Sequence, residues 1–226
     1  MLEKNKVYCW DSLELMRSIP DKSIDLVLTD PPYWMSYKSS WRENKSITKH
    51  KEIENDDNLE WLPDFLMQIK RIAKEDSHFY FFFSHHNIDI FLFELKKILP
   101  YKNILIRNKT ISWMWDLKWD YWTMTEFIVY CSNGNKKLKW NRDSNIITYT
   151  RTDNELHPTE KPVLLFKYLI EKSSEKWMTI LDPFAWSWTT GVACKELHRD
   201  YILIEKEQKY VDICNKRLNH TTTSLF

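Results

Sequence analysis

Glycine is nearly absent from this chain. Average usage of about 7% would give roughly 16 glycines in a protein of this length, but the 226 residues contain 2. Tryptophan is correspondingly abundant, with 12 residues. Glycine provides tight turns and close backbone approaches that other residues cannot make without strain. The pairing of scarce glycine with excess tryptophan therefore requires an explanation, and the motifs of the chain supply one.

Long hydrophobic runs are also absent. The longest aromatic and aliphatic run covers residues 79–83, far short of the ~20 apolar residues that span a bilayer. The first residues lack the basic-then-apolar pattern of a secretory signal. We therefore expect a cytoplasmic protein with no membrane association.

Cysteine pairs and a strong charge of one sign are missing as well. The cysteines are far apart in the chain, without a C-x-x-C pair: Cys9, Cys131, Cys194 and Cys214. We expect reduced thiols, with neither a disulfide framework nor a metal site. The net charge is +1, so affinity for nucleic acid would have to come from local basic patches.

The rest of the composition is that of a folded protein, with 43% hydrophobic and 29% charged residues. The length predicts a single domain over residues 1–226. Strand-like segments rich in β-branched and aromatic residues cover residues 24–29, 78–84, 104–107, 126–131, 179–182 and 201–205. Helical periodicity covers residues 62–74, 88–99, 163–173, 190–198 and 208–218. This alternation predicts an α/β fold with a mostly parallel, doubly wound sheet.

Two regions interrupt the alternation and are expected to be inserted loops, at residues 34–60 and 108–150. The first holds five basic residues and one acidic residue up to position 51. Within the second, residues 132–142 hold four basic residues and no acidic one. Both are candidates for phosphate contacts, and solvated surface charge is the alternative.

A first candidate site follows the strand at residues 24–29, where Asp30, Pro31, Pro32 and Tyr33 stand in sequence. Ligands of open α/β sheets bind outside the carboxyl ends of the strands. The prolines lack amide protons, which leaves the Pro31 carbonyl available as an acceptor. A carboxylate, a carbonyl and an aromatic ring suit a planar base with an exocyclic amino group. The alternative is an ordinary strand exit, where Asp and Pro are common.

A second candidate site joins the strand at residues 179–182 to a helix through Asp182-Pro-Phe-Ala-Trp-Ser-Trp-Thr-Thr190. A strand, a tight loop and a helix N-terminus form a geometry that binds anionic or polar cofactor groups. The next strand ends at Glu205, close to the ~20-residue distance at which an acid binds ribose hydroxyls. Such a loop requires glycine where Trp186 and Trp188 stand.

A third segment, His157-Pro-Thr-Glu-Lys-Pro162, precedes a predicted helix. Together the three segments resemble the S-adenosylmethionine-dependent DNA amino-methyltransferases of the β arrangement, a family that includes restriction-modification enzymes. Residues 30–33 match the D-P-P-Y signature of the family, and residues 157–162 match its H-P-T-x-K-P element. Residues 182–190 match its cofactor loop D-P-F-x-G-S-G-T-T except at Trp186 and Trp188. The order of the segments is also that of the β group, a circularly permuted Rossmann-like methyltransferase fold.

The resemblance implies a role for each matching residue. Asp30, Pro31, Pro32 and Tyr33 would form the catalytic loop around a flipped-out base. Residues implied to bind S-adenosylmethionine are Asp11, His157, Thr159, Lys161, Asp182, Phe184, Ala185, Trp186, Ser187, Trp188, Thr189 and Glu205. Within this set, Asp11 would lie near the adenine, Glu205 would bind the ribose, and His157, Thr159 and Lys161 would flank the methionine end. Alternatively, Asp11 caps a short helix at residues 13–18.

The implied function is site-specific methylation of adenine N6 in double-stranded DNA, without a metal. Adenine is favoured over cytosine N4 because Asp leads the catalytic motif, where Ser often stands in cytosine-directed relatives. The two basic regions would then contact DNA phosphates. The short chain leaves little room for a separate recognition domain, so a homodimer is an open alternative to a monomer.

The excess tryptophans fall where the family has glycine, or in turns. Besides Trp186 and Trp188, this applies to Trp10, Trp34, Trp113, Trp115, Trp119, Trp140 and Trp177. Trp61 opens an apolar helix face and is expected to be genuine. Replacing about eight such glycines at ~1–3 kcal/mol each would rival the ~5–15 kcal/mol stability of a domain. We therefore hypothesise that UGA codons meaning glycine have been translated as tryptophan. If the tryptophans are genuine, the protein would instead be an inactive DNA-binding relative.

Overall fold

The computed structural model describes residues 2–32, 60–110, 124–140, 142–150, 161–186 and 188–221. The strands are β1 (Lys6–Cys9), β2 (Ile24–Thr29), β3 (Ala73–Phe83), β4 (Tyr101–Asn108), β5 (Thr125–Ser132), β6 (Ile146–Thr148), β7 (Thr179–Asp182) and β8 (Asp200–Glu205). The helices are α1 (Ser12–Met16), α2 (Trp61–Ile72), α3 (Ile88–Ile98), α4 (Val163–Ser173), α5 (Thr189–Glu196) and α6 (Gln208–His220), with a 3₁₀ turn, η1 (His85–Asn87), before α3.

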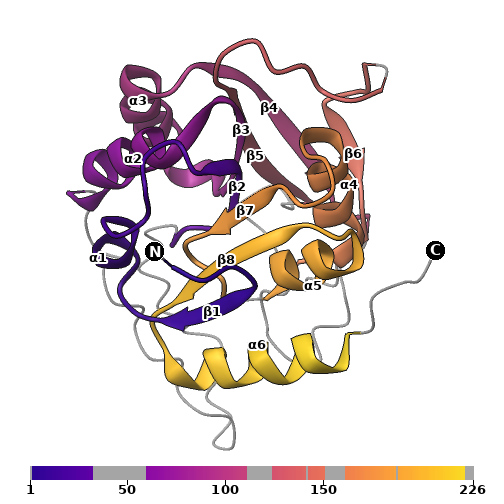
Figure 1. Ribbon diagram of the computed structural model, residues 1–226. Helices are drawn as coiled ribbons and strands as arrows, with labels where there is room; N and C mark the ends of the chain where they lie inside the picture. Colours follow the sequence, from indigo (N-terminus) through magenta and orange to yellow (C-terminus); the bar gives the residue numbers. More distant parts are fainter. Residues whose placement is uncertain are drawn as a thin grey trace, which may run out of the picture.

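The strands form one sheet in the order β1-β8-β7-β2-β3-β5-β4-β6 (Figure 1). Neighbouring strands pair in parallel from β1 through β8, β7 and β2 to β3. The reversed strand is β5, which runs antiparallel to both β3 and β4. The prediction of a mostly parallel α/β sheet is therefore confirmed.

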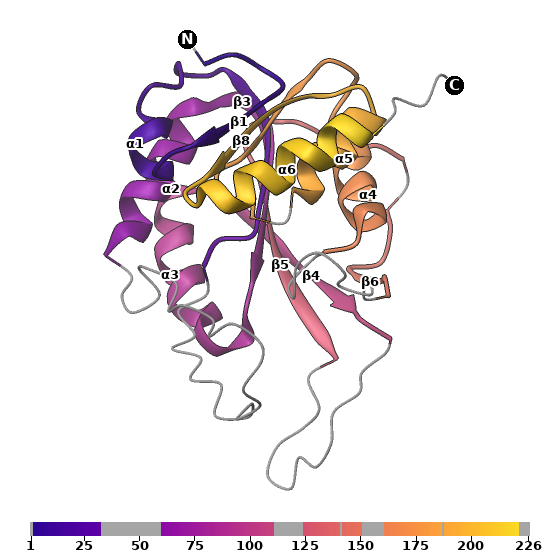
Figure 2. The same ribbon diagram turned by 90° about the horizontal axis from the view of Figure 1, so that it is seen from below.

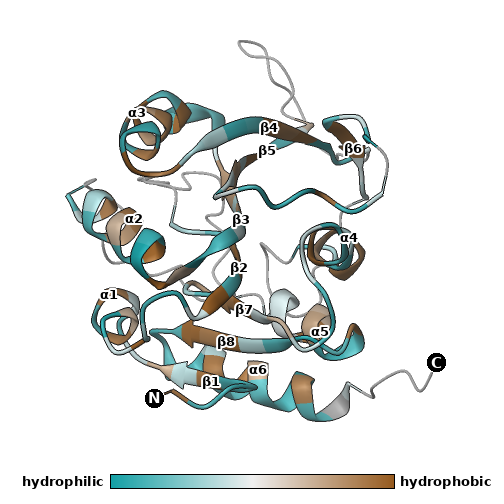
Figure 3. Cartoon of the chain, turned by 45° about the horizontal axis from the view of Figure 1, so that its top comes forward, coloured by the Kyte–Doolittle hydropathy of each residue, from teal (hydrophilic) through white to brown (hydrophobic). Residues whose placement is uncertain are grey.

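Helices cover both faces of the sheet, with α1, α2 and α3 on one face and α4, α5 and α6 on the other (Figure 2). Alternate residues of each central strand point to opposite faces, as the period of a strand requires. In β2, for example, Leu26 and Leu28 pack toward α4 and α5, while Val27 packs toward α1 and α2. Hydrophobic colouring accordingly follows the central strands, whereas the helices α2 and α3 carry mixed faces (Figure 3).

Most predicted elements agree with the observed ones, and the differences are shifted boundaries and short strands that were not predicted. The helix expected at 62–74 ends at Ile72, because Ala73 pairs with Ile24 and begins β3. The short strands β1 and β6 were not predicted. Strand β5 confirms the strand expected at residues 126–131, so the expectation of an inserted loop over residues 108–150 is wrong where β5 and β6 join the sheet. In the described ranges, no helix is long and apolar enough to span a bilayer.

Candidate active site

Three carboxylates lie at the carboxyl ends of adjacent strands. Asp30 follows β2, Asp182 ends β7 and Glu205 ends β8, and these strands are neighbours in the sheet. This edge is where open α/β sheets bind their ligands. The structure therefore brings the predicted catalytic loop and the predicted cofactor loop to one edge.

Asp30 is a buried carboxylate with one oxygen engaged. Its Oδ2 atom lies 3.0 Å from Nζ of Lys161, and its side chain is 8% exposed. Its Oδ1 atom is buried and has no hydrogen-bond partner among the described residues. Burial raises the pKa of Asp30 from 3.8 to about 6, although Lys161 acts to lower it. A buried acceptor without a donor is unfavourable in an isolated protein, so Oδ1 is poised for a ligand that donates a hydrogen bond.

Two residues that the motifs did not reveal extend the pairing of Asp30 with Lys161. Lys161 Nζ lies 3.6 Å from Oε1 of Glu126, at the start of β5. Arg107 Nη1, near the end of β4, lies 2.7 Å from Oε2 of Glu126. Burial acts to raise the pKa of Glu126, but Lys161 and Arg107 outweigh it and lower the value to about 2. The one local signal for this cluster is a charged residue, Arg107, at the end of the apolar run Ile104–Leu105–Ile106.

The buried side chain of Asp182 holds the loop after β7 in place through hydrogen bonds. Its Oδ1 atom accepts hydrogen bonds from Thr29 Oγ1 (2.8 Å) and from the Phe184 amide (3.1 Å). Its Oδ2 atom accepts a hydrogen bond from Thr190 Oγ1 in α5. Burial raises the pKa of Asp182 from 3.8 to about 6. The carboxylate thus joins β2, the loop and α5, and supports the loop through these protein contacts.

The remaining described loop residues are held by neighbouring elements. The Ala185 amide donates to the carbonyl of Ile204 at 2.9 Å, which ties the loop to β8. The ring of Phe184 lies 5.4 Å from that of Phe65 in α2. Thr189 Oγ1 donates to the carbonyl of Lys161 at 3.2 Å. The backbone of Lys161 is therefore fixed to the start of α5.

Glu205 and Asp11 lie close together at the β8–β1 edge, where Cys9 pairs with Glu205 and the Trp10 amide donates to the Glu205 carbonyl. Burial raises the pKa of Glu205 from 4.5 to about 7. Asp11 caps α1, since its Oδ1 atom accepts from the amides of Leu13 (3.0 Å) and Glu14 (3.2 Å). The capping alternative for Asp11 is confirmed, and its position beside Glu205 is compatible with the cofactor role as well.

Two tryptophans occupy the loop where the resemblance requires glycine. Trp186 Nε1 donates to the carbonyl oxygen of Asp30 at 2.8 Å, so its indole extends from the cofactor loop to the catalytic loop. Trp188 is fully buried and precedes α5 with φ 45° and ψ 2°. That left-handed conformation is a genuine outlier for a bulky residue and is ordinary for glycine.

The same conformation recurs at two other suspected positions. Trp140 has φ 60° and Trp177 has φ 68°, and both side chains are largely exposed. Trp61 was expected to be genuine. It lies in helix α2, where its ring packs 5.4 Å from that of Phe65. Of the suspected tryptophans within the described residues, Trp140, Trp177 and Trp188 therefore have the left-handed backbone, whereas Trp10 and Trp186 do not.

Several predicted residues lie outside the described part of the structure: Tyr33, His157, Thr159 and Ser187. The basic region 34–60 also lies outside it, apart from Glu60. Among the residues that are described, no three His, Cys, Asp or Glu side chains are grouped to hold a metal ion.

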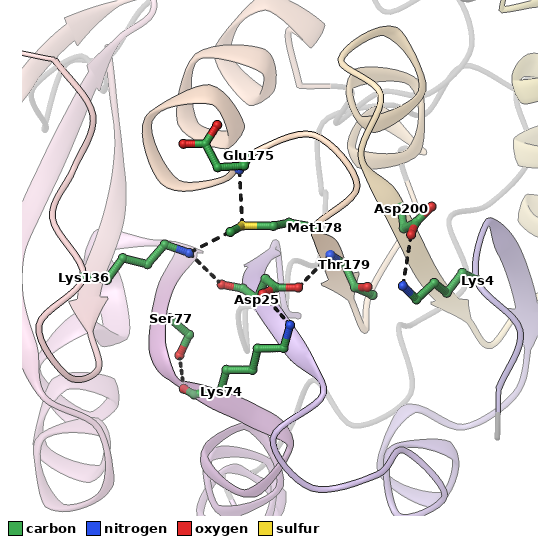
Figure 4. A network of polar contacts seen from close by, with 9 residues as sticks. All are labelled: Lys4, Asp25, Lys74, Ser77, Lys136, Glu175, Met178, Thr179 and Asp200. Carbon is green, nitrogen blue, oxygen red and sulfur yellow. Dashed lines mark hydrogen bonds and ion pairs between the residues drawn. The ribbon is translucent and has the colours of Figure 1, made fainter.

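The second basic stretch, residues 132–142, lies at the end of the sheet opposite to the carboxyl ends of β2, β7 and β8. It follows the end of β5, where Ser132 pairs with His78 in the middle of β3. Lys136 contributes to the fold at that edge, with Nζ 3.4 Å from the carbonyl oxygen of Asp25 and 3.9 Å from the sulfur of Met178 (Figure 4). Because β5 runs antiparallel, it carries this stretch away from Asp30. That location favours solvated surface charge, the alternative stated for the stretch, while its contact with DNA stays a prediction for binding measurements.

Comparison with known proteins agrees with this arrangement. Residues 24–216 match the DNA methylase family of the N6/N4 type. The Type II methyltransferase M2.MboI of Moraxella bovis is 27% identical over 259 aligned positions, which cover 99% of this chain and 91% of that protein.

Two solved structures share the fold. The M1.HpyAVI–SAM complex matches with a TM-score of 0.74 and 23% identity, covering 95% of this chain and 98% of that one. The cytosine-N4-specific PvuII DNA methyltransferase matches with a TM-score of 0.76 and 19% identity, covering 96% and 87%. At these identities the two structures establish the fold alone. The family match, in contrast, extends from β2 to α6 and includes Asp30, Asp182 and Glu205. The chain belongs to the N6/N4 DNA methylase family.

Proposed function

We propose that this protein methylates the N6 amino group of adenine at a specific site in double-stranded DNA, with S-adenosylmethionine as methyl donor. The observation that carries the proposal is the Asp30 carboxylate. It is buried at the ligand-binding edge of the sheet and its Oδ1 atom has no donor among the described residues. An exocyclic amino group supplies the missing donor.

Asp30 and Pro31 perform the positioning of the amino group. The nitrogen of adenine N6 is a weak nucleophile because its lone pair is delocalised into the ring. Hydrogen bonds from its two protons to Asp30 Oδ1 and to the Pro31 carbonyl draw the nitrogen toward tetrahedral geometry and direct its lone pair outward. The Asp30 carboxylate also stabilises the positive charge that develops on the nitrogen, a preorganised electrostatic effect. The base must leave the duplex to reach this pocket, which costs a few kcal/mol.

S-Adenosylmethionine supplies an electrophilic methyl group on a sulfonium. Glu205 fits this cofactor, since a carboxylate at the end of the strand after the loop accepts hydrogen bonds from ribose hydroxyls. Trp186 does not fit it, because the indole lies between the loop and Asp30, where the methyl group must approach the amino nitrogen. Tyr33, His157, Thr159 and Ser187 complete the proposed site, and residues 34–60 are proposed to contact DNA.

The mismatch at Trp186 supports a second part of the proposal: UGA codons in this gene mean glycine. Trp140, Trp177 and Trp188, which were suspected from sequence, all have the left-handed backbone that glycine favours. Sequencing the gene tests this directly. UGA at positions 186 and 188 is expected, whereas UGG there would refute it and favour the inactive DNA-binding relative. The protein with glycine at every UGA position is called the glycine-restored chain below.

The test of the proposed function is methylation of duplex DNA by the glycine-restored chain, followed by digestion and mass spectrometry of the nucleosides. N6-Methyladenine is expected. N4-Methylcytosine would instead support cytosine as the substrate, the alternative that the shared fold with the PvuII enzyme keeps open.

The role of Asp30 is tested in the same assay. Asp30→Ala is expected to reduce the rate by about 100-fold or more, the usual effect of removing a preorganised polar group. Asp64→Ala, at an exposed carboxylate in α2, serves as the matched control and should leave the rate unchanged. An undiminished rate for Asp30→Ala would refute the proposed mechanism.

A further inference from the structure

A line of four alternating charges extends from the proposed catalytic carboxylate into the sheet. Asp30 contacts Lys161 at 3.0 Å, Lys161 contacts Glu126 at 3.6 Å, and Glu126 contacts Arg107 at 2.7 Å. Arg107 ends the line by donating from Nε to the Tyr149 carbonyl at 3.1 Å and from Nη2 to the Thr150 carbonyl at 3.0 Å. We call Asp30, Lys161, Glu126 and Arg107 the charge chain.

We infer that Lys161 is a positioning residue for methyl transfer: it keeps the Asp30 carboxylate charged and holds its Oδ2 atom, so that Oδ1 remains for the amino group of the base. This inference rests on the proposed function, because it assumes that Asp30 receives the base. It differs from the role that the family resemblance implied for Lys161, which was contact with the methionine end of the cofactor.

The location of Lys161 supports a fixed rather than a mobile cation. Its side chain is 6% exposed, and its ammonium lies 5.4 Å from the centre of the Phe82 ring. Its carbonyl accepts the hydrogen bond from Thr189, and the next residue, Pro162, occupies the N-cap position of α4. A lysine with a fixed backbone and a buried side chain can hold one oxygen of a carboxylate in a constant orientation.

The charge of Asp30 depends on this arrangement. An ionised carboxylate only accepts hydrogen bonds, so Asp30 Oδ1 can receive one proton of the amino group while the Pro31 carbonyl receives the other, whereas a protonated carboxyl carries a competing donor. Burial raises the pKa of Asp30 to about 6 even with Lys161 present. Charged groups face Asp30 from each adjoining element: Lys161 before α4, Glu126 in β5, Arg107 in β4 and Asp182 in β7. Lys161 is the nearest cation, so without it Asp30 would be protonated near neutral pH.

Glu126 acts in the opposite direction. It repels the charged form of Asp30 and shares the ammonium group of Lys161. Its removal should therefore lower the pKa of Asp30, whereas the removal of Lys161 should raise it. A general loosening of the site would not move the pKa of Asp30 in opposite directions when Lys161 and Glu126 are removed in turn.

The experiment measures the single-turnover methylation rate of the glycine-restored chain as a function of pH, with cofactor affinity measured separately by calorimetry. For Lys161→Met, we expect the acidic limb of the pH–rate profile to move to higher pH by about one unit or more. At pH values below the pKa of Asp30 in both proteins, this displacement is about a 10-fold loss of rate. The rate should recover in alkaline solution, and cofactor affinity should stay within about twofold. Lys161→Arg should keep the original profile.

Two further variants control for misfolding. Glu126→Gln should move the acidic limb downward, which keeps the inference testable if Lys161→Met does not fold. Lys167→Met removes a half-buried lysine of α4 that pairs with Glu196, and it should leave the profile unchanged.

A uniform loss of rate in Lys161→Met with no displacement of the profile would overturn the inference, as would a loss of cofactor affinity with an unchanged profile. Failure of the proposed function itself would be seen separately, as an undiminished rate in Asp30→Ala.

Discussion

Replacing Trp177 with glycine should stabilise the protein, although it removes the largest side chain. Trp177 has φ 68° and is 70% exposed. A left-handed conformation costs an L-residue about 1–2 kcal/mol, and glycine avoids this cost. Glycine in turn loses about 0.5–1 kcal/mol through the greater entropy of the unfolded chain. The exposed indole makes a ring contact with His198 at 6.2 Å, so little packing is lost. The net expectation for Trp177→Gly is a gain of about 0.5–1 kcal/mol.

Urea unfolding at constant m-value measures this gain, and thermal unfolding should show a rise of about 1–4 °C for a chain of this size. Trp10→Gly is the matched control. Trp10 is also exposed, at 56%, but its φ is not positive. The Trp10→Gly variant should lose about 0.5–1 kcal/mol of stability, because glycine raises the entropy of the unfolded chain there and relieves no backbone strain. An equal loss of stability in both variants would refute the argument that the backbone at position 177 is built for glycine.

Three other predictions follow from the structure. Burial raises the pKa of Glu205 from 4.5 to about 7, so the native state binds a proton that the unfolded state releases in this interval. Stability should therefore fall as pH rises from about 4.5 to about 7, and Glu205→Gln should flatten this dependence in urea unfolding. Asp11→Ala removes the cap of α1 and should lower the free energy of unfolding by about 1 kcal/mol in the same assay, while a neutral result would contradict the capping geometry. DNA affinity should weaken steeply with salt, and Lys137→Gln with Arg142→Gln should leave both the affinity and its salt slope unchanged; a reduced slope would place the stretch 132–142 at the DNA after all.

The ordering of motifs and the alternation of elements allowed much of the fold to be predicted. Strands and helices were found because hydrophobic periodicity is a local property, and the edge that carries Asp30, Asp182 and Glu205 followed because parallel strands end on one side. Boundaries were less accurate. Helix α2 ends at Ile72, because pairing of Ala73 with Ile24 overrides a periodicity that continues to Lys74.

The sequence by itself determined the family resemblance, the ligand-binding edge and the suspicion that many tryptophans occupy glycine positions, since each depends on residues close together in the chain. Tertiary structure decided the partners of Asp30 and the location of residues 132–142. Lys161, Glu126 and Arg107 lie on separate elements, and their approach to one carboxylate depends on how those elements cross the sheet. The antiparallel direction of β5 cannot be read from its alternation, yet it brings Glu126 to the site and carries the basic stretch to the opposite edge.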